Sequence, residues 1–317
     1  MVSLVQLSYI IAVDNYRHFA TAAQKCFVTQ PTLSMQVQKL EDELGILIFD
    51  RSKFPVTPTD IGKAVIEQAR KVLQETARIS DIISIHSKEI SGVFRVGVIP
   101  TIAPYLLPLF LESFLENYPK VDLVIDEIQT HQILEKLRKE EIDVGLMATP
   151  LYQNDLTENP LYYEPFVAYV PPGHRLYKKK KIAAGELSVN DILLLKEGHC
   201  FREHALQLCK DHASHKHQFN LRFEGGNLET LKKLVEKNFG MTLLPYLATK
   251  DIENKEQMKY LREFEAPVPK REISLVYLRA YLKKHIINAF ETEILKAVAD
   301  SPIAQTIMSK ENSFIVE

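Results

Sequence analysis

Apolar residues at the start of the chain recur with the period of an α-helix. Leu4, Leu7, Ile10 and Ile11 are spaced by three and four residues, which places them on one face of a helix. Segment 19–24 contains small residues that let two helices approach closely. The pattern therefore predicts a packed pair of short helices.

A third helix, over residues 30–40, follows a short break at 27–29. Thr29 can cap its first turn, and Pro31 suits that turn because a proline there loses no helical hydrogen bond. Short polar side chains occupy the positions outside its apolar face: Thr32, Ser34, Gln36 and Gln38. Such hydroxyls and amides can bond to base edges and phosphates in a major groove. A solvated polar face is the alternative, but the order helix, break and polar-faced helix favours DNA binding.

Residues 59–88 form one long helical segment, whose start Thr59 and Asp60 can cap. Its apolar positions step by four, seven, seven and three residues, as in a coiled-coil seam: Ile61, Val65, Val72, Ile79 and Ile82. A helix of about 30 residues is about 45 Å long and cannot bury such a stripe on itself. The stripe could pack on the chain's own domains, but we expect it to pair with a second copy, which would bring two recognition helices to one operator.

Beyond residue 90, short apolar strands alternate with helical segments. The pattern predicts strands at 93–100, 121–128, 142–147, 166–170, 241–245 and 273–278, and helices at 104–117, 131–139 and 285–299. This alternation predicts an α/β fold with a parallel sheet covered by helices. Thr101 directly follows the first strand, where its hydroxyl could contact a ligand or cap the next helix.

Length and charge narrow the class of protein. At 317 residues the chain is too long for one core, so two or three domains are expected. Its hydrophobic fraction of 46% and charged fraction of 25% are ordinary for a soluble globular protein. The net charge is −2, and residues 1–60 hold five basic against six acidic residues. DNA binding must therefore depend on where single cations are placed.

Cys26, Cys200 and Cys209 are too few for the disulfide framework of a small secreted protein. Neither a signal peptide nor a membrane span is evident, so we expect a cytoplasmic protein without membrane contact. In that compartment a disulfide serves as a signal more often than as a structural link. Cys26 follows the second helix and is interpreted as a small core residue.

The segment around Cys200 combines a turn, a helix start and nearby cations. Residues 193–195 resemble a buried strand, and the sequence from Cys200 onward favours a helix. In a first helical turn, with Lys196, His199 and Arg202 nearby, the thiol pKa would fall from about 8.5 towards neutrality. If residues 200–209 are helical, Cys209 lies about 13.5 Å further along the axis, whereas a disulfide requires Cα atoms within about 7 Å. A bond between the two would require the segment to refold.

Several motifs resemble the winged helix-turn-helix of LysR-type regulators. They are Ala22-Ala23, Gln30-Pro31-Thr32-Leu33-Ser34, Leu40-Glu41-Asp42-Glu43-Leu44-Gly45 and Phe49-Asp50-Arg51. The resemblance implies DNA contacts by Gln30, Pro31, Thr32, Ser34, Gln36, Lys39 and, in the wing, Arg51. It also implies a linker helix that forms a homodimer or homotetramer, and a two-lobed regulatory domain like periplasmic binding proteins. The expected limits are 1–58 for the DNA-binding domain, 59–90 for the linker, 91–300 for the regulatory domain (lobe I 92–163 plus 268–300, lobe II 164–267) and 301–317 for a tail.

A second group of motifs resembles the peroxide-sensing members of that family. They are Ile99-Pro100-Thr101, Gln129-Thr130-His131-Gln132, Gly198-His199-Cys200 with Arg202 and Cys209, Leu228-Glu229-Thr230-Leu231, and Thr242-Leu243-Leu244-Pro245. This resemblance implies that Cys200 reacts with hydrogen peroxide and that Cys209 resolves it into a disulfide. The implied pocket is Thr101, Thr130, His199, Arg202 and Arg271. Implied partners are operator DNA, hydrogen peroxide, RNA polymerase and a thiol reductant of the glutaredoxin or thioredoxin type, with no cofactor and no enzymatic turnover.

Other interpretations compete with this one. The cysteines could be unrelated core residues in a LysR-type regulator of a small anionic metabolite, or they could serve a cysteine peroxidase. A peroxidase would have no use for a DNA-binding module. A metal sensor could use His204, Cys209, His212, His215 and His217, but their spacing fits no recognised site, and solvated loop histidines are the simpler interpretation.

Overall fold

The computed structural model describes residues 2–87, 90–209, 225–250, 252, 254–278, 283–299 and 311–316. The chain forms two compact units, Met1–Glu89 with Ala280–Leu282, and Ile90–Arg279 with Lys283–Glu317. Within the described residues, no helix combines the length and the apolar character needed to span a membrane.

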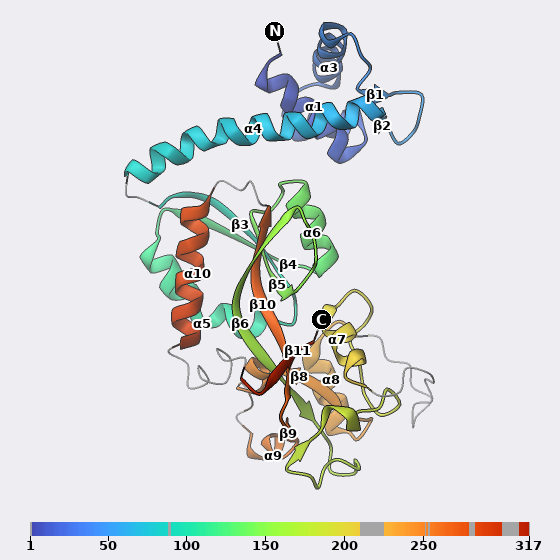
Figure 1. The fold of residues 1–317 in the computed structure, drawn as a ribbon, viewed down its shortest axis with the longest axis vertical. Coiled ribbons are helices and arrows are strands. Elements are labelled where there is room, and N and C mark those ends of the chain that lie inside the picture. The colour runs from blue at the N-terminus through green and yellow to red at the C-terminus, as the bar shows by residue number, and fades with distance from the viewer. Residues whose placement is uncertain are drawn as a thin grey trace. The chain divides into compact units, whose positions relative to one another are not determined.

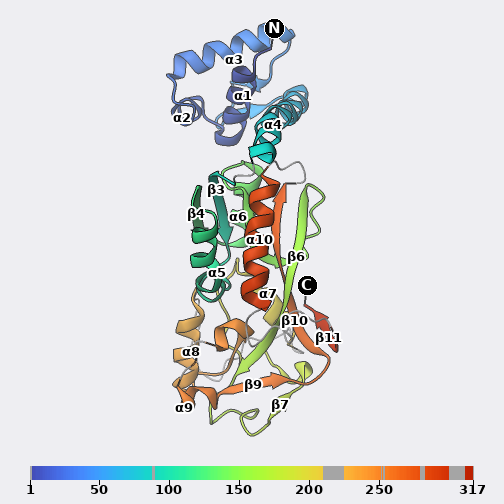
Figure 2. The ribbon, with the colours of Figure 1, turned by 90° about the vertical axis from the view of Figure 1, so that its left-hand side faces the viewer.

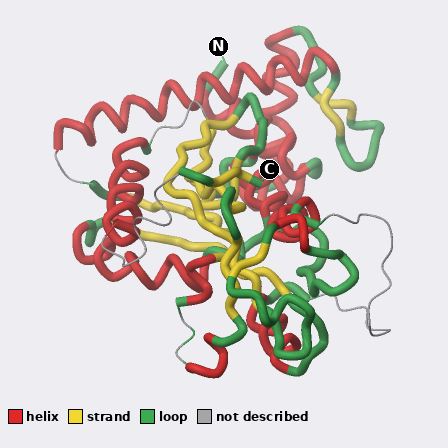
Figure 3. The backbone as a smooth tube through the Cα atoms, turned by 60° about the horizontal axis from the view of Figure 1, so that its bottom comes forward, coloured by secondary structure: helices red, strands yellow, loops and turns green. Residues whose placement is uncertain are grey.

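The first unit is a helical domain with a small β-hairpin (Figures 1 and 3). Its elements are α1 (Leu4–Tyr16), α2 (Phe19–Lys25), α3 (Gln30–Leu44), β1 (Phe49–Asp50), β2 (Thr57–Pro58) and α4 (Asp60–Ser87). The strands β1 and β2 pair antiparallel. The predicted helices are confirmed, and Ile10, Val13, Leu33, Val37 and Leu40 are fully buried in one core. Leu4 alone leaves the predicted apolar stripe: it is exposed in the first turn of α1.

Short side chains fix the helix starts, as the sequence predicts. The Thr29 hydroxyl accepts a hydrogen bond from the Thr32 amide, with Pro31 in the first turn of α3. The Thr59 hydroxyl accepts from the Gly62 amide at 2.9 Å at the start of α4. On α4, Ile61 is exposed and Val65 is half-buried, so the N-terminal part of the predicted seam is only partly covered within one chain. The side chains of Ile79 and Ile82 lie outside the described part.

The second unit is built on one long sheet with the strand order β4-β3-β5-β10-β6-β9-β7, with β11 on β10 and β8 on β6. Its strands are β3 (Gly92–Val98), β4 (Val121–Glu127), β5 (Val144–Thr149), β6 (Leu156–Tyr169), β7 (Lys181–Ile182), β8 (Thr242–Pro245), β9 (Leu261–Phe264), β10 (Val268–Leu278) and β11 (Ser313–Ile315). Its α-helices are α5 (Ala103–Asn117), α6 (Thr130–Arg138), α7 (Cys200–Gln207), α8 (Leu228–Glu236), α9 (Lys255–Met258) and α10 (Lys284–Ala299).

The predicted parallel sheet is only partly correct. Strand β3 pairs parallel with β4 and β5, but β10 pairs antiparallel with both β5 and β6. The long strands β6 and β10 run side by side from one lobe into the other (Figure 2). They therefore form the connection between the two lobes, and residues at their middle can reach both.

Each lobe has its own apolar core. In the first lobe, α5 and α10 lie side by side, and the rings of Phe94, Phe110 and Phe114 each meet Phe290 edge to face (Figure 1). In the second lobe, the ring of Phe166 on β6 packs against Phe201 of α7 at 5.2 Å. Residues 313–315, for which the sequence predicts no element, form β11 along β10.

Candidate functional site

Cys200 is the first residue of α7, as predicted, and a sharp turn brings it against the start of α6. Gly198 has φ +90°, a left-handed conformation that favours glycine. A Cβ there would lie 2.7 Å from the Gln129 side-chain oxygen, so a larger residue would also have to displace the end of that side chain. Since Gln129 precedes Thr130, the turn brings the Thr130 hydroxyl into hydrogen-bonding contact with the Cys200 thiol.

The cation of this site is Arg271 on β10, which is 1% exposed. Its Nε and Nη2 donate to Glu164 Oε2 at 3.0 and 2.7 Å, directly across the β6–β10 register. Its Nη1 donates to the Thr101 hydroxyl at 2.8 Å, and Nη2 also donates to the Thr101 carbonyl oxygen at 3.0 Å. The guanidinium lies 5.1 Å from the ring centre of Phe201, the residue after Cys200. The site is thus assembled from both lobes.

The predicted low thiol pKa is wrong in direction. Burial raises the pKa of the Cys200 thiol above its ordinary value. The Arg271 charge and the Thr130 hydrogen bond act in the opposite direction but do not offset burial. Moving the thiolate out of water costs more free energy than the Arg271 cation, which Glu164 shares, and the Thr130 hydroxyl contribute to stabilising it.

Two of the predicted pocket residues do not supply positive charge to the thiol. Burial, followed by the charge of Lys196, lowers the pKa of His199 below its ordinary value, so this imidazole is neutral at pH 7. The Arg202 guanidinium donates to the Leu195 carbonyl oxygen at 2.9 Å. Thr101 does not cap α5, whose start has no side-chain cap.

Several buried polar atoms of the predicted pocket and its neighbouring residues have unused hydrogen-bonding capacity. Apart from the thiol, the Thr130 hydroxyl has no hydrogen-bond partner within the described residues, and neither does His199 Nε2. The Tyr162 hydroxyl, two residues before Glu164, is buried in the same condition. Buried polar groups are rarely left unpaired, so the Thr130 hydroxyl beside the thiol is a candidate contact for a small polar molecule.

Cys209 is buried just past the end of α7, and both cysteines are free thiols. Its sulfur lies 3.3 Å from the Ala205 carbonyl oxygen, one helical turn back. At the rise of an α-helix, the nine-residue step from Cys200 corresponds to about 13 Å between the two Cα atoms, which is beyond the span of a disulfide.

His204 is not the solvated loop residue that the sequence suggested. It is buried beside Phe166, and burial lowers its pKa to about 4. His212, His215 and His217 lie outside the described residues. In the remainder of the chain, no group of three or more His, Cys, Asp or Glu residues is arranged to hold a metal ion.

The positions predicted to face DNA lie on the accessible side of α3. Gln30, Pro31, Thr32 and Lys39 are exposed, while Ser34 and Gln36 are partly exposed. These exposures are compatible with a groove-facing surface, and contact with DNA itself stays a prediction.

In the wing, Arg51 is already paired. Its Nη2 lies 2.7 Å from Glu41 Oε2, and its guanidinium lies 5.1 Å from the ring centre of Phe19. Glu41 is 4% exposed, and its Oε1 accepts the amides of Ile48 and Phe49 at 2.8 and 3.1 Å. Glu41 thus joins α3 to the hairpin and holds Arg51 in place. The phosphate contact of Arg51 remains a prediction.

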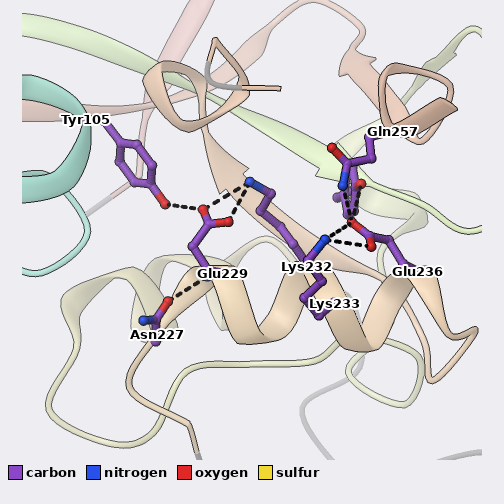
Figure 4. Close-up of polar contacts among 8 residues, drawn as sticks. Tyr105, Asn227, Glu229, Lys232, Lys233, Glu236 and Gln257 are labelled. Carbon is purple, nitrogen blue, oxygen red and sulfur yellow. Dashed lines mark hydrogen bonds and ion pairs between the residues drawn. The ribbon is translucent and has the colours of Figure 1, made fainter. Parts of the chain in front are cut away.

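A second polar contact joins the lobes at α8 (Figure 4). The Tyr105 hydroxyl on α5 donates to Glu229 Oε1 at 3.1 Å, and Lys232 Nζ lies within 3.0 Å of both carboxylate oxygens. Asn227 caps this helix by accepting the Glu229 amide at 2.7 Å. The chain thus has a hydrogen bond between lobes in addition to the two long strands.

Sequence reasoning missed Glu41 and Glu164, which hold Arg51 and Arg271, two of the three predicted arginines. Acidic residues at helical or strand positions are normally solvated, so their type carries no signal. The only available indication was the apolar neighbourhood of each: Leu40 precedes Glu41, and an apolar strand follows Glu164.

Comparison with known proteins agrees with this architecture. The family model described as LysR substrate binding domain matches residues 87–299, and the one described as bacterial regulatory helix-turn-helix protein, lysR family, matches residues 4–63. The hydrogen peroxide-inducible genes activator of Haemophilus influenzae is 36% identical over 271 residues, covering 86% of this chain and 89% of the relative. The DNA-binding transcriptional dual regulator OxyR of Escherichia coli is 34% identical over 271 residues, covering 86% and 88%.

Solved structures give the same picture. A full-length OxyR of Pseudomonas aeruginosa with one cysteine replaced by aspartate has a TM-score of 0.74 and 34% identity, covering 93% of this chain and 98% of that one. A peroxide-bound OxyR variant of Corynebacterium glutamicum, with one cysteine replaced by serine, has a TM-score of 0.61 and 28% identity, covering 98% of each chain. With its winged helix-turn-helix, long helix and two-lobed α/β unit, the chain belongs to the LysR family of bacterial regulators.

Proposed function

We propose that this chain is a DNA-binding transcription regulator that senses hydrogen peroxide by reversible formation of a disulfide between Cys200 and Cys209. The observation that carries the proposal is the surroundings of Cys200: its thiol contacts the Thr130 hydroxyl, which has no other partner within the described residues, and lies within reach of the charge of the buried Arg271. The names and titles of similar proteins, which refer to hydrogen peroxide, support the same chemistry.

The first step oxidises Cys200. Its thiolate attacks one peroxide oxygen, the O–O bond breaks, and the products are a sulfenic acid and hydroxide, which takes up a proton to become water. The sulfur loses two electrons to the peroxide. Arg271 stabilises the thiolate, and the hydroxyls of Thr101 and Thr130 are the donors that position the oxygens. His199 is a further pocket residue, and Arg202 supports the pocket through Leu195.

The second step couples chemistry to shape. The Cys209 thiol attacks the sulfenic sulfur, forming the disulfide and releasing water. The separation of about 13 Å means that α7 must unwind before the sulfurs meet. The refolded segment would change how two or four copies engage the operator and RNA polymerase. A dithiol of the glutaredoxin or thioredoxin type in the cytoplasm would reduce the disulfide and reset the protein.

Mass spectrometry after treatment with one equivalent of peroxide tests the proposal. We expect a cross-linked peptide containing Cys200 and Cys209 and a changed footprint on operator DNA. In the Cys200→Ser variant neither change should occur, while Cys26→Ser serves as the matched control and behaves as wild type. A free Cys209 beside an oxidised Cys200 would reject the resolving role.

Two other functions give different outcomes. A cysteine peroxidase would consume many equivalents of peroxide in the presence of a dithiol without any change in its DNA footprint. A regulator of a small anionic metabolite would keep its footprint after peroxide treatment in both wild type and Cys200→Ser. The presence of a LysR-type DNA-binding unit favours the sensor over the enzyme.

A further inference from the structure

The last strand of the chain lies beside the residue that acts on Cys200. Strand β11 pairs parallel with the start of β10, with Val268 opposite Ser313 and Lys270 opposite Ile315. The Val316 amide donates to the Lys270 carbonyl oxygen at 2.8 Å, and the Val268 amide donates to the Asn312 carbonyl oxygen at 2.8 Å. Arg271 is the next residue along β10.

The position of β11 on the sheet shows how it can hold the backbone of Arg271. On one edge, β10 pairs with β6 from Lys270 onward. On the other edge, β5 begins only at Glu272. Since a strand has two edges, β11 must occupy the second edge over residues 268–270, where β5 is absent. Arg271 therefore lies at the junction between two strands on that edge, and its backbone is fixed on both sides only when β11 is in place.

The packing of the tail is specific as well. Val316 is 3% exposed, and Lys270 on the opposite strand is 5% exposed, which is rare for a lysine. These residues lie beyond the LysR-family match, which ends at residue 299. The strand therefore lies outside the matched residues, and it is anchored to the domain by its pairing with β10 and by the buried Val316 that follows it.

We propose that β11 is a positioning element for the redox site: by completing the hydrogen bonding of β10 it holds Arg271 at the geometry that stabilises the Cys200 thiolate. This inference rests on the proposed function, because it concerns the reactivity of the same thiol. Arg271 has little freedom of its own, since Glu164 and Thr101 fix its guanidinium. A displacement of its backbone would consequently move the charge relative to Cys200 or break one of these contacts.

The test compares two substitutions at one position of the full-length chain. Val316→Pro removes the amide that bonds to Lys270, whereas Val316→Ala retains it and loses a similar amount of packing. Both are made in a Cys26→Ser, Cys209→Ser background, so that only Cys200 reacts with iodoacetamide. The alkylation rate is measured across pH, because a purely structural role of β11 would not move the midpoint of that profile.

For Val316→Pro we expect the midpoint to move upward by about half a pH unit, which means about threefold less thiolate and a similarly slower reaction at neutral pH. Val316→Ala should stay near the parent profile. Identical profiles for the two variants would overturn the inference. If Val316→Pro does not fold, a chain lacking 311–317 is measured with and without a synthetic peptide of that sequence. Recovery of the profile by the peptide supports positioning, and failure of this chain to fold as well would assign β11 to stability alone and reject the proposal.

Alkylation requires no peroxide, so it separates the two proposals. If the protein with all its cysteines forms no disulfide with peroxide, the proposed function fails whatever the alkylation profiles are. If that protein forms the disulfide and the two Val316 variants react alike, only the role of β11 fails.

Discussion

Replacing Arg271 by methionine is the most direct perturbation of the site. Arg271 and Glu164 are each 1% exposed, and methionine retains the length of the side chain without its charge. The change leaves the Glu164 carboxylate buried, and among the described residues the Leu247 amide at 2.8 Å is the donor that remains. Breaking a buried ion pair by removing one partner costs about 3–5 kcal/mol, because the other charge stays out of water. For a unit of this size, we expect the melting temperature to fall by about 10 °C.

A double-mutant cycle separates the pair from the rest of the site. Glu164→Gln in the Arg271→Met background removes the stranded charge, so part of the lost free energy of unfolding should return. Thr101→Val is the matched control, because it removes one acceptor of the same guanidinium and should cost only about 1–3 kcal/mol. Urea unfolding of the full-length chain, followed by circular dichroism, measures four variants: Arg271→Met, Glu164→Gln, the double variant and Thr101→Val.

The same substitution has a chemical consequence. Arg271 is the main influence that lowers the thiol pKa against burial, so Arg271→Met should raise that pKa further. The rate of peroxide oxidation at pH 7 should fall accordingly. The reasoning is refuted if Arg271→Met costs no more stability than Thr101→Val, or if Glu164→Gln adds its full separate cost to Arg271→Met.

Three further predictions concern other buried polar groups. Glu41→Gln weakens three hydrogen bonds to the wing and should cost about 2 kcal/mol of unfolding free energy and reduce operator affinity, whereas Asp42→Asn on the exposed face should change neither. Thr130→Val removes a hydrogen bond that lowers the pKa of Cys200, so the pH profile of thiol alkylation should move upward, and Thr130→Ser should restore it. Burial lowers the pKa of His204 from 6.5 to about 4, so between these values the unfolded chain binds a proton that the folded chain does not. Stability should fall by about 3 kcal/mol as pH drops through that range, and calorimetry should find that His204→Phe removes this loss.

The sequence predicts the local elements well because periodicity reports a nearby, repeated environment. The starts of α3 after Thr29 and of α4 after Thr59 follow from capping chemistry that a few consecutive residues contain. The strand predicted at 166–170 begins ten residues earlier, at Leu156. The prediction missed this first part because Pro160 and Pro165 interrupt the apolar pattern. A register shift beside Ile273 accommodates that irregularity. The direction of the strands could not be predicted, because a local pattern does not show which distant strand will be the neighbour.

The position of Cys200 in the fold was predicted, but the electrostatics around it were not. Position in the first turn of a helix is local, and Cys200 was correctly placed there. Its burial and the approach of Arg271, 71 positions later, are tertiary. The prediction therefore assigned the lowering of the thiol pKa to cations close in sequence, whereas the cation that lowers it is Arg271 on β10. It also left out the cost of burying the thiolate.

A thiol with a raised pKa is compatible with a peroxide sensor once the leaving group is considered. Only the thiolate attacks, and burial makes it the minor form, but a more basic thiolate is also the stronger nucleophile. Attack on peroxide expels hydroxide, which requires hydrogen-bond donors, whereas a common alkylating agent expels iodide, which requires far less help. The Thr130 hydroxyl, which contacts the thiol, is a donor that could stabilise the departing oxygen. Selectivity for peroxide would then come from donors that act on the departing oxygen, and a small thiolate population would protect Cys200 from other electrophiles.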